Sequence, residues 1–224
     1  MKGKFETAVF LIGGSVILDG FDGTVARLTK TESNFGVQLD SLVDAVTFGL
    51  VPAAMIYKWG FQFADPSIGK VLAFIFLTAG VVRLARFNVL KEAHAVPSNI
   101  FVGLPIPLGA LAICSAVLMM GKPLETQSEM LIFSFYVVLI ALLMVSTIKY
   151  RTMKKIRSRN NLLILLSLAI LIAFAINYPR HAIPVMALLY IISPIFFFFW
   201  GKLSRNKQTP VPTETVPGKG EESD

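Results

Sequence analysis

Long apolar stretches recur along this 224-residue chain, and they constrain its fold more than any other feature. A helix needs about 20 mostly apolar residues to cross the hydrocarbon core of a membrane. Seven such segments are predicted, at residues 5–26, 37–57, 69–90, 102–121, 130–149, 162–178 and 182–200. Only 16% of the residues are charged, whereas soluble domains carry about 25%. The sequence therefore predicts an all-α, polytopic transmembrane helical bundle.

The last 24 residues differ in composition from the rest. Residues 201–224 are polar and rich in proline, which is typical of a disordered tail. We therefore expect one membrane domain over residues 1–200 and a disordered cytoplasmic tail over residues 201–224.

The basic residues predict the orientation of the bundle. Cytoplasmic loops of membrane proteins carry an excess of Lys and Arg. Most of the basic residues fall on one side of the predicted helices, in the regions 27–30, 83–91, 149–159 and 202–219. We attribute the net charge of +7 to these loops and expect no nucleic-acid partner.

Four aspartates interrupt the first two predicted helices: Asp19, Asp22, Asp40 and Asp44. A charged side chain at the centre of a bilayer costs about 2.5–3.5 kcal/mol on insertion scales. The members of each pair are three or four residues apart, so they share a helix face. If residues 28–35 connect the helices, the two acidic faces can oppose each other. That arrangement predicts a cage of carboxylate oxygens.

Carboxylate oxygens indicate the kind of ligand such a cage would hold. Hard oxygen donors suit Mg²⁺ or Mn²⁺, with Ca²⁺ as a third candidate. Divalent metals with open coordination positions typically engage phosphates. The simpler alternative is that the acids lie in water at helix ends, or pair with Arg27 and Lys30. Small residues on the same faces would leave room for a substrate, or would only allow tight helix packing; they are Gly23, Ala26 and Gly36.

The complete pattern resembles the signature of a known family. It reads Asp19-x-x-Asp22-Gly23-x-x-Ala26-Arg27, eight residues, then Gly36-x-x-x-Asp40-x-x-x-Asp44, and it resembles the CDP-alcohol phosphatidyltransferases. The resemblance implies an integral membrane enzyme that transfers a phosphatidyl group from a CDP-linked lipid to an alcohol and releases CMP. It also implies that Asp19, Asp22 and Asp40 bind metal and that Asp44 is the catalytic base and a further metal contact. Gly23, Ala26, Arg27 and Gly36 would then receive the CDP-lipid.

Three further stretches resemble the bacterial-type phosphatidylserine synthases within that family. They are "DAVTFGLVPA" (44–53), "RLARFNV" (83–89) and "FVGLPIPLGA" (101–110). This resemblance implies CDP-diacylglycerol and L-serine as substrates, with Arg83, Arg86 and Asn88 binding serine or phosphate. It further implies a homodimer in a prokaryotic cell membrane, with the active site facing the cytoplasm. Members of the family usually have one more helix before the Asp19 helix, so we expect an eighth, N-terminal span that this sequence lacks.

Three other interpretations stay open at this point. The acceptor could be glycerol 3-phosphate or an inositol phosphate, although a phosphate-bearing acceptor favours a denser basic pocket. A divalent-ion transporter could use the four acids as a transit site, but it would need polar breaks in several helices, and the spans predicted after Asp44 contain no acids. A non-catalytic membrane scaffold would leave the spacing of the acids unexplained.

Overall fold

The computed structural model describes residues 2–29, 33–93, 100–151 and 184. All of them belong to one compact unit, Met1–Pro194. The predicted segments at 162–178 and 182–200 and the predicted tail lie outside the described residues, apart from Pro184.

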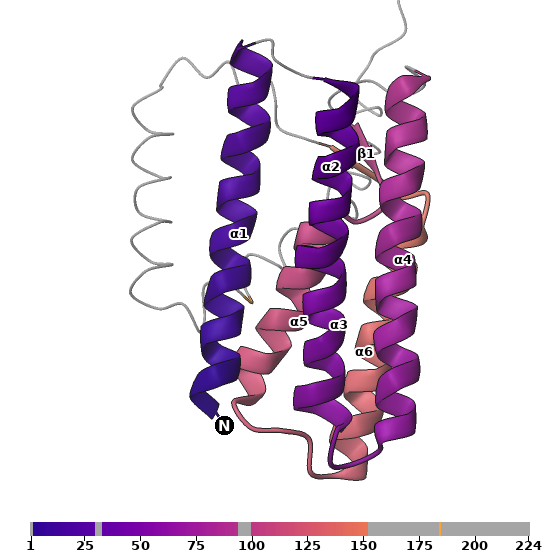
Figure 1. The fold of residues 1–224 in the computed structure, drawn as a ribbon. Coiled ribbons are helices and arrows are strands. Elements are labelled where there is room, and N and C mark those ends of the chain that lie inside the picture. Colours follow the sequence, from indigo (N-terminus) through magenta and orange to yellow (C-terminus); the bar gives the residue numbers. More distant parts are fainter. Residues whose placement is uncertain (1, 30–32, 94–99, 152–183, 185–224) are drawn as a thin grey trace, which may run out of the picture. The chain divides into compact units, whose positions relative to one another are not determined.

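The described part of the chain is almost entirely helical (Figure 1). Its elements are α1 (Lys2–Thr29), α2 (Asn34–Asp44), η1 (Ala45–Leu50), α3 (Val51–Met55), η2 (Ile56–Phe61), α4 (Pro66–Glu92), β1 (Ile100–Val102), α5 (Ile106–Met120), α6 (Gln127–Val145) and β2 (Lys149–Arg151). Within this part, three helical segments are long and apolar enough to cross a membrane: Phe35–Phe61, Pro66–Glu92 and Gln127–Val145. The predicted helical membrane fold is confirmed, while the count of seven spans stays a prediction.

Local sequence signals set the helix ends. Asp65 accepts hydrogen bonds from the backbone N–H groups of the first turn of α4, and Pro66 follows it at the first helical position. Thr126 and Glu129 form a reciprocal capping box at the start of α6. Gly121 ends α5 in the left-handed conformation, with φ of 64°.

The second predicted helix is longer and less regular than expected. We predicted one ordinary helix over 37–57, but the structure shows a continuous helical run over residues 34–61 with two π-helical segments, η1 and η2. Pro52 lies just after η1; it has no N–H to donate, and its ring would clash with the carbonyl oxygen four residues earlier in an α-helix. The wider turn of a π-helix accommodates this proline.

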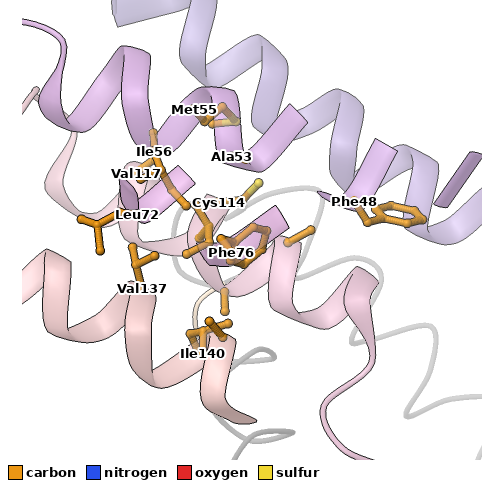
Figure 2. Packing of buried hydrophobic residues seen from close by; sticks show 14 of the residues in the cluster. Phe48, Ala53, Met55, Ile56, Leu72, Phe76, Cys114, Val117, Val137 and Ile140 are labelled. Carbon is orange, nitrogen blue, oxygen red and sulfur yellow. The ribbon is translucent and has the colours of Figure 1, made fainter. Parts of the chain in front are cut away.

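The hydrophobic core lies where α4 packs against α6, where η1, α3 and η2 pack against α4, and where η1 and α3 pack against α5. Figure 2 shows Phe76 of α4 near Ile140 of α6 and Cys114 of α5, all fully buried or nearly so. The thiol of Cys114 is free and buried, so this cysteine fills the core.

Close packing at Gly69 leads to a prediction about stability. A Cβ at this position would clash with Cβ of Phe61 and would lie 3.2 Å from Cδ2 of Tyr57. We expect Gly69→Ala to lower the free energy of unfolding by about 1–3 kcal/mol, the usual cost of overpacking. Thermal unfolding of the detergent-purified protein measures the effect.

Gly14 in α1 supplies the matched control for this substitution. No described atom lies within 4 Å of a Cβ placed there. Since alanine is the better helix former by about 1 kcal/mol, Gly14→Ala should keep or raise the melting temperature. Equal melting temperatures for the two variants would contradict the proposed packing role of Gly69.

One part of the fold departs from the all-helical prediction. Strands β1 and β2 form a short antiparallel pair in which Phe101 is opposite Tyr150 and Val102 is opposite Lys149. Of the strand residues, only Val102 and Lys149 fell within predicted helices, 102–121 and 130–149, each as a terminal residue. The pair joins the segment after α4 to the segment after α6, close to the C-terminal end of α4 in Figure 1.

Candidate metal centre

Three of the four predicted aspartates meet in the structure. Asp19 lies in α1, and Asp40 and Asp44 lie one turn apart in α2. One carboxylate oxygen from each lies within 4.8 Å of the other two. Asp19 and Asp44 are half-buried, and Asp40 is exposed. The predicted opposition of two acidic helix faces is therefore present for these residues.

The helix that carries two of these acids begins and ends at identifiable signals. Ser33 is the N-cap of α2, and its hydroxyl accepts a hydrogen bond of 3.0 Å from the N–H of Gly36. Asp44 is the last residue of α2, and the π segment η1 begins directly after it. π segments within helices are frequent at functional sites. The change of turn lets Asp44 lie at the acidic cluster while Phe48 is buried in the core.

The charges at the cluster are unbalanced. Two carboxylates at this separation repel each other by about 1–4 kcal/mol, depending on access of solvent. Among the residues whose side chains the structure describes, the charged groups that act on Asp44 are Asp19, Asp40 and Arg83, which is one guanidinium beside three carboxylates. Oxygen donors without nitrogen or sulfur suit a hard divalent cation. The residues present therefore fit the metal that the family resemblance implies.

Arg83 is one of the three residues predicted to bind serine or phosphate, and its charge acts on the acidic cluster. It is 5% exposed, lies in α4, and its Cζ stands 5.2 Å from the ring centroid of Phe87. A cation over an aromatic face is attracted by the ring. Packing in this way fixes the direction of a long side chain whose charge acts on the cluster.

Arg86 and Asn88 are placed differently. The guanidinium of Arg86 donates to backbone carbonyl oxygens at the end of α6 and in β1. Nδ2 of Asn88 donates a 2.9 Å hydrogen bond to Oγ of Ser41, which lies between the two acids of α2. A role of either side chain in binding serine or phosphate stays a prediction. Sequence reasoning missed Ser41, because nothing in the local sequence announces a partner 47 residues away.

The remaining predicted site residues have no described side-chain surroundings, with one exception. Asp22, Gly23, Ala26 and Arg27 lie in the last two turns of α1, and their side chains are outside the described part. Gly36 is exposed in the first turn of α2. Their roles in binding metal or CDP-lipid therefore stay predictions.

Comparison with known proteins gives the class to which this site belongs. The family model of the CDP-alcohol phosphatidyltransferases matches residues 1–148. Because this match covers more than half of the chain, the protein belongs to the CDP-alcohol phosphatidyltransferase family. It is an enzyme that uses a CDP-linked lipid, and the expected membership is confirmed.

Similar proteins narrow the comparison further. A CDP-diacylglycerol–serine O-phosphatidyltransferase of Helicobacter pylori is 38% identical over 209 residues, which is 91% of this chain and 85% of the relative. Proteins with the same name from Methanocaldococcus jannaschii and Mycobacterium tuberculosis are 41% and 33% identical. They match 62% and 83% of this chain, and 61% and 66% of their own lengths.

Proposed function

We propose that this protein is a phosphatidylserine synthase, which transfers the phosphatidyl group of CDP-diacylglycerol to the hydroxyl of L-serine and releases CMP. The observation that carries the proposal is the similarity over 91% of the chain to a relative named for that reaction. Three converging carboxylates at the family motif give it a chemical basis.

We assign the metal site to Asp19, Asp40 and Asp44, with Asp22 as a fourth ligand on the strength of the motif alone. A divalent cation, Mg²⁺ or Mn²⁺, would offset charge on the pyrophosphate and on the phosphoryl group in transfer. Ca²⁺ would satisfy the same oxygen donors at longer distances.

Asp44 is our choice for the catalytic base. It accepts the proton of the serine hydroxyl while the serine oxygen forms a bond to the lipid-side phosphorus. The bond between that phosphorus and the oxygen of CMP breaks in the same displacement. Among the described residues, Arg83 is a cation whose charge acts on Asp44, against the like charges of Asp19 and Asp40.

The other parts of the substrate pocket are assigned from the motif. Gly23, Ala26, Arg27 and Gly36 receive the CDP-lipid, and Arg83 is our first choice for the serine carboxylate. Further parts of the proposal are a homodimer in a prokaryotic cell membrane and an active site facing the cytoplasm. The excess of Lys and Arg in the loops on the side of the aspartates supports that orientation.

Release of CMP by the purified, detergent-solubilised protein tests the proposal. CDP-diacylglycerol and Mn²⁺ or Mg²⁺ would be supplied with L-serine, glycerol 3-phosphate or an inositol phosphate in turn. We expect release that depends on serine and stops when EDTA removes the metal. Release with another acceptor alone would keep the family and overturn the assigned substrate. Metal transport without release of CMP would instead support the transporter alternative.

A further inference from the structure

The guanidinium of Arg86 lies at the meeting point of three chain segments. It donates two short hydrogen bonds, 2.7 Å from Nη1 to the carbonyl oxygen of Val145 and 2.8 Å from Nη2 to that of Ser146. Two longer contacts run from Nη2 to the carbonyl oxygens of Val102, at 3.3 Å, and Met144, at 3.4 Å. These acceptors belong to the end of α6 and to β1, so one side chain of α4 joins both.

Three of the four acceptors are carbonyl oxygens at the end of α6. The last carbonyl groups of a helix have no partner within it. At the end of α6, the N–H of Ser146 pairs with the oxygen of Leu142, and the N–H of Leu104 pairs with that of Leu143. Arg86 serves the next three carbonyl oxygens. Its positive charge also suits the negative end of the helix dipole.

Gly103 makes this meeting sterically feasible. Its φ of 77° is in the left-handed region, where glycine is favoured. A Cβ there would clash with the carbonyl oxygen of Met144 and would lie 2.7 Å from Nη2 of Arg86. The N–H of Gly103 also donates a 2.8 Å hydrogen bond to Ile148. Gly103 and Arg86 therefore form one clamp between α4, the end of α6 and the connection from β1 to α5.

The part of α4 held by this clamp also faces the acidic cluster. Arg83, three residues earlier, carries a positive charge that acts on Asp44. Asn88, two residues later, is hydrogen-bonded to Ser41 beside Asp40. A rotation or shift of the end of α4 would therefore move both contacts at once.

We propose that Arg86 is a positioning residue for the transfer reaction: with Gly103, it clamps the C-terminal end of α4 so that Arg83 and Asn88 are held against the acid-bearing helix α2. If Arg86 bound the acceptor directly, its guanidinium would have to break hydrogen bonds to carbonyl oxygens that have no partner within their own helix. Losing the partner of such a group costs more than a typical hydrogen bond contributes.

Two substitutions test the clamp from its two sides. Arg86→Lys keeps the charge but replaces the planar fork of donors with a single ammonium group. Gly103→Ala leaves Arg86 unchanged and places a methyl group inside the clamp. Lys91→Gln is the control, because Lys91 is exposed on the last turn of the same helix. Steady-state release of CMP, normalised to the amount of folded protein, gives kcat and the KM for the acceptor. Amide hydrogen exchange measures the local stability of residues 100–106 and 142–151.

We expect both clamp variants to lower kcat by about 10- to 100-fold, the scale of a misplacement near 1 Å, and to change the KM for the acceptor to a similar extent in both, because both shift Arg83. Exchange in both segments should quicken, and Lys91→Gln should behave as the wild type. A rise in the acceptor KM of Arg86→Lys that Gly103→Ala does not share would identify Arg86 as a ligand of the acceptor and overturn the proposal. Loss of thermal stability with an unchanged kcat would also overturn it, because the role would then be structural only.

The result stays decisive in two less simple cases. If Arg86→Lys gives no folded protein, Gly103→Ala decides by the same criteria. The inference rests on the proposed function only for the choice of acceptor. A wild type that releases CMP with an acceptor other than serine would overturn that choice, while the clamp would still be judged from the variants with the acceptor that works.

Discussion

Asp44→Asn is expected to lower kcat for CMP release by about 10²- to 10⁴-fold, the usual contribution of a general base, while CDP-diacylglycerol still binds. The amide has nearly the shape of the carboxylate but cannot accept the proton of the serine hydroxyl. Equilibrium binding of labelled CDP-diacylglycerol and turnover at saturating Mn²⁺ measure the two properties separately.

Asp65→Asn is the matched control for this experiment. Asp65 caps α4 at the end remote from Arg83, and asparagine is an equally good cap, so turnover should be unchanged. The assignment of Asp44 as the base would be wrong if Asp44→Asn kept near-normal turnover. It would also be wrong if excess Mn²⁺ restored full activity, since Asp44 would then be a metal ligand only.

Removing either of the other two carboxylates of the cluster is expected to abolish metal-dependent turnover. Asp19→Ala and Asp40→Ala each delete one of three oxygen donors that lie within 4.8 Å of one another. We expect at least about a 10³-fold loss of kcat/KM at ordinary metal concentration, because the metal would supply much of the electrostatic stabilisation of the transition state. Mn²⁺ titration followed by electron paramagnetic resonance measures metal affinity without relying on turnover.

The same titration extends to the fourth aspartate. Asp22→Ala should weaken Mn²⁺ binding as the other two substitutions do if the motif assigns it correctly. Unchanged Mn²⁺ affinity in Asp19→Ala and Asp40→Ala would refute the metal site. Normal Mn²⁺ affinity with lost turnover would instead show that the substituted aspartate is needed for catalysis and not for binding the ion.

Helix positions were largely predictable from the sequence, and the irregularities were not. Apolar stretches predicted 69–90 and 130–149, and the structure has α4 over Pro66–Glu92 and α6 over Gln127–Val145. Hydrophobicity reports only that a segment is buried in lipid or protein. It does not distinguish a π turn from an α turn, nor the start of a helix from a short strand such as β1.

Some contacts of the candidate site were likewise predictable from the sequence, and others were not. The three- and four-residue spacings predicted shared faces within a helix, so the meeting of Asp40 with Asp44 followed from the sequence. The partners of Arg86 did not, because the carbonyl oxygen of Val145 lies 59 residues away in sequence. A backbone carbonyl is present at every residue, so sequence alone cannot single out the one that an arginine reaches.

The sequence by itself determined the class of fold and the acidic motif, because apolar length and residue spacing act within one helix. The chemistry of the motif was implied by the family that it resembles. Only the tertiary structure decided which partners three polar residues near the end of α4 contact. Arg83 stacks on Phe87 with its charge acting on Asp44, Arg86 caps α6, and Asn88 holds Ser41. These differences arise because α4 packs against η1 and α6, where buried and half-buried polar groups find partners from distant parts of the chain.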